Sequence, residues 1–240
     1  SSDIDGITMY PRMHGDDGWY AFEPTPFNAG ALPIWFWSQD AQDVTRVAND
    51  EWVSFVRGGG GMFPEKALES DLETLRRRVE LMRTDTTTPD TRLSDDMNPI
   101  NPAITENLTR LMLGGLPTGR DGHALHCRLR YFDADRRRAG LPEDVGALVE
   151  QMDADNVIVS LVNCSPIHQR TVVVQGGAYA EHGCKVVADG KTVPETSQHF
   201  DSKRGSAFVV RLAPGCGGKL QVRQQRYVHL PTFAFPWDRP

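Results

Sequence analysis

The second half of the chain consists of short apolar runs separated by turn residues. Two β-branched runs, at residues 157–162 and 171–174, flank a polar segment that contains Ser165 and Pro166. This pattern predicts a strand, a tight connection and a second strand. We expect six strands, at residues 123–132, 157–163, 171–175, 184–188, 207–212 and 220–227, with a hairpin turn at Asp189-Gly190. Short strands at this spacing predict an antiparallel β-sandwich.

The stretch from Tyr131 to Met152 is more polar than its neighbours. We expect it to contain one short helix, with Pro142, Glu143 and Asp144 in the first turn. Acidic side chains suit the positive end of the helix dipole.

Apolar residues three and four positions apart dominate the chain before residue 116. Ser38 suits the N-cap of a first helix with its apolar face formed by Val44, Val47, Ala48, Trp52, Phe55 and Val56. The glycine run at 57–61 ends it, and we interpret this run as a hinge or lid, since no strand precedes it and no Gly-Lys-Ser/Thr follows. Pro64 suits the first turn of a second, packed amphipathic helix with the stripe Leu68, Leu72, Leu75, Val79 and Met82. A third helix begins at Asn101-Pro102 and stops at Gly114-Gly115.

Residues 1–37 are rich in aromatic residues and interrupted by prolines, so we expect irregular structure there. Aromatic rings beside acidic groups can bind a sugar or an apolar ligand. The candidate catalytic residues are His14, Asp16, Asp17 and Glu23, and the candidate substrate-binding residues are Trp19, Tyr20, Trp35 and Trp37. The alternative is that these aromatic residues only anchor an extended arm to the core.

A long polar loop between the second and third helices concentrates oxygen-bearing side chains. Asp90, Asp95 and Asp96 could bind Ca²⁺, which prefers oxygen ligands. The spacing does not fit an EF-hand, and short polar side chains more commonly form turns and helix caps. The sequence therefore leaves open a calcium site or no cofactor.

Composition excludes some classes of partner. The 240 residues carry a formal net charge of -6, which argues against a nucleic-acid-binding protein. No apolar run approaches the roughly 20 residues that span a bilayer, so we expect a soluble protein and favour the cytoplasm. The chain begins at Ser1 without Met, as an interior point of a longer polypeptide would. We expect the four cysteines, Cys127, Cys164, Cys184 and Cys216, to be free and buried, although two disulfides are possible.

Two further groups of residues are candidate catalytic sites. Glu181 beside His182 could perform acid–base catalysis, but neighbours on a strand point to opposite faces, so we expect them not to converge. Cys164 and His168 could form a nucleophile and base, but a turn between strands lacks the helix N-terminus that lowers a thiol pKa.

Several phrases between Met62 and Trp237 resemble the C-terminal half of large bacterial proteins related to linalool dehydratase/isomerase. They are MFPEKALESDL, TTTPDTRLSDD, RYFDADRRRAGLPEDVGALV, RTVVVQGGAYAEH and RYVHLPTFAFPWDR. The resemblance implies a fold in which an (α/α) helical toroid precedes a β-sandwich. It implies no catalytic residue in this chain, because the toroid's acids and cysteines would come from sequence outside it.

We therefore expect an α+β protein with two parts. Residues 1–116 would hold the aromatic arm and an incomplete α/α toroid, and residues 117–240 the antiparallel β-sandwich. The first hypothesis is the C-terminal portion or subunit of a toroid enzyme, a dehydratase-like lyase or a carbohydrate-active enzyme, with a second polypeptide or an N-terminal domain completing the toroid. The second is a glycoside hydrolase or polysaccharide lyase that binds a glycan at the arm. The third is a non-catalytic carbohydrate-binding or assembly module.

Overall fold

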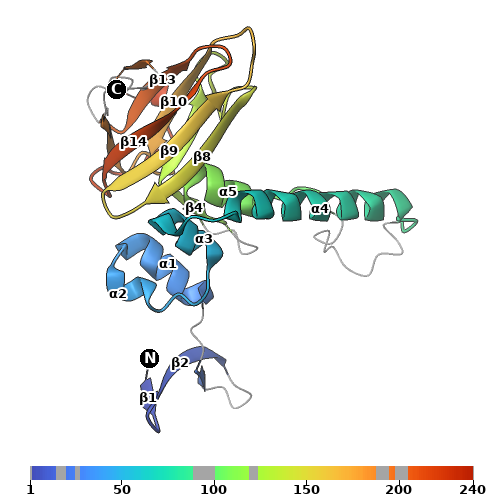
Figure 1. The fold of residues 1–240 in the computed structure, drawn as a ribbon, viewed down its shortest axis with the longest axis vertical. Helices are drawn as coiled ribbons and strands as arrows, with labels where there is room; N and C mark the ends of the chain where they lie inside the picture. Colours follow the sequence, from blue (N-terminus) through green and yellow to red (C-terminus); the bar gives the residue numbers. More distant parts are fainter. Residues whose placement is uncertain are drawn as a thin grey trace.

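The structure, a computed structural model, describes residues 2–14, 20–24, 28–88, 101–118, 124–187, 195–197 and 205–239. It confirms the α+β class: after a small N-terminal sheet come the helices, and antiparallel sheets packed as a sandwich follow them (Figure 1).

Two antiparallel sheets form the sandwich. One has the order β12-β13-β10-β6-β7, formed by Glu195–Ser197, Ala207–Leu212, Arg170–Gly176, Leu129–Asp133 and Arg138–Ala139. The other has the order β11-β14-β9-β8, formed by Gly183–Val187, Gly217–Gln225, Asn156–Asn163 and Val145–Met152. A short ladder of β4 (Gly115–Leu116) and β5 (His126–Cys127) leads into them. Five of the six expected strands lie close to their predicted positions, and the first is divided between β5 and β6. The hairpin expected at Asp189-Gly190 lies outside the described residues.

The prediction of a helix after Pro142 is wrong, because Val145–Met152 is strand β8 and pairs with β9. Its β-branched and apolar residues fit a pleated surface, and Val149 and Met152 are buried. The acidic residues before it belong to a tight turn. Asp144 has a φ of +62°, and its carbonyl accepts the Cys164 amide.

The helical segment differs from the prediction at its start. Asn28–Ser38 is helix α1, with Pro33 inside it, where we expected irregular structure. A proline inside a helix costs about 3 kcal/mol, but Leu32, Trp35 and Phe36 are buried in the core, and this burial offsets that cost. The predicted first helix is divided into α2 (Ala41–Val44), α3 (Glu51–Ser54) and a single π-helical turn, η1 (Phe55–Gly59).

The second and third helices follow the prediction more closely. Helix α4 spans Phe63–Thr84, and α5 spans Glu106–Leu113. Gly114 ends α5 in the left-handed conformation, as predicted. Asn101 does not start the helix, because its side chain accepts the Ala103 amide in a turn before Thr105.

One hydrophobic core joins the helices to the sandwich. Trp35, Trp52 and Val56 belong to the same buried cluster as Val157 and Leu220 of the sheets. Trp52 is fully buried and meets Trp35 edge to face at 6.1 Å between ring centroids. The helices α1–α3 and the sandwich therefore stabilise one another.

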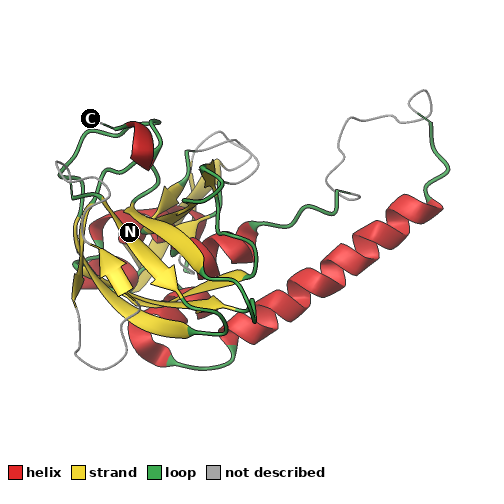
Figure 2. Ribbon diagram, turned by 90° about the horizontal axis from the view of Figure 1, so that it is seen from above, coloured by secondary structure: helices red, strands yellow, loops and turns green. Residues whose placement is uncertain are grey.

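Two elements extend away from this core. The arm forms a small antiparallel sheet, β1 (Ser2–Ile4), β2 (Ile7–His14) and β3 (Tyr20–Glu23), where we expected irregular structure. Helix α4 projects sideways from the sandwich (Figure 2). Near the C-terminus a 3-10 turn, η3 (Pro236–Asp238), packs against Phe132.

Candidate functional site

Most of the predicted site residues lie outside the described part of the chain. This applies to Asp16, Asp17, Trp19, Asp90, Asp95 and Asp96, whose assignments stay predictions. His14 and Tyr20 are paired in the ladder between β2 and β3, and Glu23 pairs with Tyr10 at the end of the same ladder. Within the described residues, no group of three or more His, Cys, Asp or Glu side chains is arranged to hold a metal ion.

The two described tryptophans of the predicted binding set lie in different environments. Trp35 is only 2% exposed and belongs to the core, whereas Trp37 is 53% exposed. The Trp37 ring rests edge to face on His126 at 5.0 Å between ring centroids. The structure therefore does not bring these rings together as one platform, and their roles in substrate binding stay predictions.

Two irregular elements meet where the helices join the sandwich. One is η1, and π-helical turns occur frequently at functional sites. The other is a β-bulge in β8, where Val149 pairs with Val159 and Gln151 with Ile158, so that Glu150 is the extra residue. Bulges are common beside active sites because they re-aim side chains. Since η1 and β8 are in contact, the candidate site lies at this junction.

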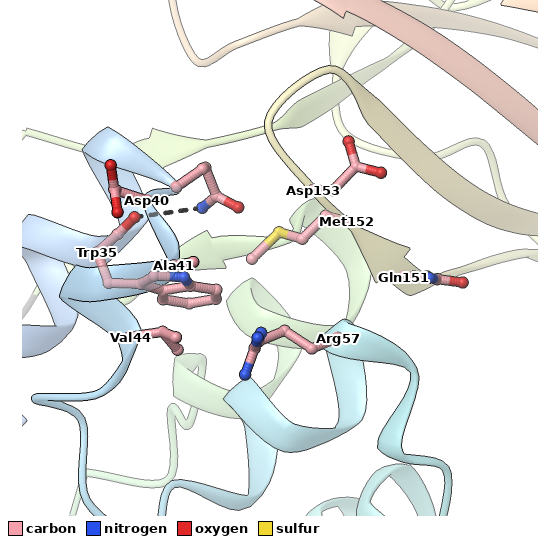
Figure 3. A pocket seen from close by; sticks show the side chains of 9 residues that line it. Trp35, Asp40, Ala41, Val44, Arg57, Gln151, Met152 and Asp153 are labelled. Carbon is pink, nitrogen blue, oxygen red and sulfur yellow. Dashed lines mark hydrogen bonds between the residues drawn. The ribbon is translucent and has the colours of Figure 1, made fainter.

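A first pocket, of about 190 Å³, lies on the α1 side of the junction. Trp35, Val44 and Met152 form its apolar part, and Arg57 enters it from η1 (Figure 3). Asp40 caps α2 and Asp153 caps the turn before β9, so both carboxylates accept backbone amides. Ligand pockets usually measure about 300–1,000 Å³, so this one suits only a small ligand.

A second crevice, of about 380 Å³, lies on the other side of η1, against the outer face of the four-stranded sheet. Its polar centre is Glu150. The carboxylate accepts the Ser160 hydroxyl of β9 and forms an ion pair with Lys219 of β14. The glycine run forms the opposite wall, through Gly58, Gly60 and Gly61.

The glycine run can form this wall because it has conformations that other residues avoid. Gly58 has a φ of +86°, and a side chain at Gly59 would begin 2.7 Å from the Ser54 carbonyl oxygen. The prediction of a hinge or lid is not tested, but the residues do border a cavity.

The expectation that Glu181 and His182 point apart is wrong. Residues 177–182 form a turn between β10 and β11, with Ala180 at a φ of +60°, so the alternation of a strand does not apply. Both side chains are buried, and His182 Nε2 lies 3.9 Å from Glu181 Oε1. The Gly176-Gly177 pair before them was the sequence signal for this turn.

The surroundings of this pair make it structural. The Glu181 carboxylate accepts the amides of Ala178 and Tyr179. Burial, and next the charge of Arg128, lower the pKa of His182 to about 3, so the ring is neutral at pH 7. Its Nδ1 accepts the Tyr227 amide at 3.1 Å. Both side chains thus stabilise the backbone of this turn. The Glu181 carboxylate is already occupied by two backbone amides, which does not favour a role as a general base.

None of the four cysteines, all of which the structure describes, forms a disulfide, as expected, but only Cys127 is fully buried. Burial raises the pKa of the Cys127 thiol far above its usual range, so it stays protonated and unreactive. Cys164 and Cys216 are exposed, which corrects the expectation of burial for these two.

Helix α4 presents the most pronounced apolar surface of the helical segment. Its stripe, here defined as Leu68, Leu72, Leu75, Val79 and Met82, was predicted to be packed. Instead, Leu72 is 50% exposed and Met82 49%. Among the described residues, no helix is long and apolar enough to cross a membrane.

Part of the chain matches a known protein family. Residues 48–109 match a family described as a domain of unknown function, DUF8034. The matched stretch runs from just before α3 into α5 and stops before the sandwich. No curated protein and no solved structure matches the chain.

Proposed function

We propose that this chain is the C-terminal portion, or a separate subunit, of an enzyme with an (α/α) helical toroid. In this proposal α4 packs against helices outside the chain, and the sandwich supports the domain that holds the active site. The observation that carries it is the exposed stripe of α4, since an amphipathic helix normally buries such a stripe against another element.

The spacing of the stripe favours a helix as the partner. The intervals from Leu68 to Met82 alternate between four and three residues, which is the a/d repeat that packs helices side by side. Helix α4 has 22 residues, a length of about 33 Å. This is enough for several layers of contact with one or two long helices, as neighbours in a toroid supply.

Contacts within the chain indicate which side of α4 is free. Asn107 donates to the Asp71 carboxylate at 2.9 Å, and Arg78 donates to the Asn101 carbonyl at 2.9 Å. The returning segment therefore covers the flank that contains Asp71 and Arg78. The stripe and the charged residues on its other flank, Glu69 and Arg76, lie open for an incoming helix.

The resemblance to linalool dehydratase/isomerase-like proteins supplies the reaction class in this proposal, a dehydratase-like lyase or a carbohydrate-active enzyme. The active site would lie in the completed toroid, with the arm and the loop after α4 at its edge.

The first test is native mass spectrometry of the protein purified from its own host, with the N-terminus mapped. We expect either a longer polypeptide that includes this chain or a second polypeptide that copurifies with it. A complete, monodisperse monomer would contradict it.

A variant localises the contact. Leu72→Glu places a charge in the middle of the stripe and should weaken the association at least tenfold, measured by sedimentation or surface plasmon resonance. Glu73→Gln, one residue further along α4 on an exposed position, is the matched control and should leave it unchanged.

A further inference from the structure

We propose that the crevice between η1 and the outer face of β8, β9 and β14 binds an uncharged, polyhydroxylated molecule such as a sugar. This inference is independent of the proposed function, because it uses neither the α4 stripe nor the arm.

The bulge of β8 creates the polar floor of the crevice. In a regular strand Glu150 and Gln151 would point to opposite faces. Because Glu150 is the extra residue, Gln151 pairs with Ile158, and all three side chains line the crevice on the outer face of the sheet. A carboxylate and an amide thus lie next to each other, with three acceptor oxygens and one NH2 donor group from consecutive residues.

The charges of the crevice favour a neutral ligand. Lys219 is the cation among its lining residues, and it is already paired with Glu150. Glu65, from the first turn of α4, adds a second carboxylate. A phosphate or carboxylate ligand would find no uncompensated positive charge, whereas hydroxyl groups can both donate to the carboxylates and accept from the ammonium and the amide.

The remaining walls suit the shape of a sugar. Phe55, Leu148 and Ile158 supply apolar surface for the C–H face of a ring. On the opposite side, a side chain at Gly60 or Gly61 would meet no atom within 4 Å. The glycines therefore leave room beside the backbone, and the volume of about 380 Å³ lies within the usual range for ligand sites.

Glu150 is central because two partners orient it before any ligand arrives. The Ser160 hydroxyl and the Lys219 ammonium both contact its carboxylate, and these two residues face each other across β9 and β14. A carboxylate held in this way loses less side-chain entropy on binding than a free one.

The test is isothermal titration calorimetry of the chain with glucose, mannose, galactose, cellobiose and maltose. We expect at least one sugar to bind with a Kd between about 0.1 and 10 mM. Glu150→Gln should weaken binding by about tenfold or more, because hydrogen bonds to a charged group are the stronger ones.

Glu143→Gln is the matched control. Glu143 is also paired, with Arg136, on the surface of the sandwich, but lies outside the crevice. Its substitution should leave sugar binding unchanged. Circular dichroism and thermal unfolding establish that both variants are folded.

Three results would overturn the inference. These are no binding of any sugar in the panel, equal affinity for the wild type and Glu150→Gln, and saturable binding of inorganic phosphate in the crevice in place of sugars.

Discussion

Strand β14 and helix α4 have equally regular patterns, yet they end in opposite environments. In β14 the alternate residues Leu220, Val222 and Gln224 are almost fully buried between the sheets. In α4 the stripe residues Leu72 and Leu75 remain 50% and 39% exposed. The pattern of a sequence thus identifies the face that favours burial, whereas burial itself depends on a partner that this chain supplies to one element and not to the other.

Helix α1 is the opposite case to α4, because its pattern is irregular but several of its apolar residues are buried. Its apolar residues form no clear stripe and it contains Pro33, but Trp35 and Phe36 are buried. Arg226 at the end of the sandwich donates to the carbonyls of Trp37 and Ser38, which α1 leaves unpaired at its C-terminus. A poorly patterned helix is therefore held in place by neighbours that the better patterned α4 lacks.

Truncation of a buried β14 residue should have the largest effect on stability. Leu220→Ala removes a side chain that is 1% exposed in the shared core. We expect a loss of about 2–5 kcal/mol in the free energy of unfolding, measured by urea denaturation. A loss below 1 kcal/mol would mean that the core is not packed as described.

Acidification should have an intermediate effect, through His182. Its pKa in the folded chain is about 3, below the ordinary 6.5, so between these values the unfolded chain binds a proton that the folded chain does not. His182 therefore contributes stability above pH 6.5, and this contribution falls by up to about 1.4 kcal/mol per pH unit as the pH drops below about 6.

The control for this prediction is His182→Gln, which can still accept the Tyr227 amide but does not titrate. The difference in unfolding free energy between the two proteins should change between pH 7 and pH 4. A constant difference would show that His182 does not drive the acid sensitivity.

Truncation within the stripe of α4 should have the smallest effect in the isolated chain. Leu72→Ala should alter the free energy of unfolding by no more than about 0.5 kcal/mol, because the side chain is half exposed. Thermal unfolding of the chain alone measures this. A large loss would mean that the stripe is already covered, for instance by self-association.

Much of the fold was predictable from local signals. The β-branched runs predicted β9, β10, β11 and β13, and Gly114 marked the end of α5. The errors occurred where tertiary contacts outweigh local preference. We predicted irregular structure at α1 because of its proline, but burial of apolar residues in the core offsets the cost of Pro33. The acidic residues before β8 resemble the start of a helix but form a turn.

The candidate site was less predictable than the fold. A β-bulge is a property of the pairing between two strands, so the sequence around Glu150 carries no local signal for it. Ser160 and Lys219 come from strands that become neighbours only through the sheet. The glycine run was the one visible element of the crevice, and its isolated sequence does not indicate which surface it faces.

The contact of Arg226 with α1 also bears on how the chain folds as it is synthesised. The residues it joins, Trp37 and Arg226, are 189 positions apart, and contacts over such separations form late because a long loop must close first. Helix α1 can therefore gain this contact only after residue 226 has been synthesised. A chain that ends before residue 226 would lack the donor that pairs the Trp37 and Ser38 carbonyls at the end of α1.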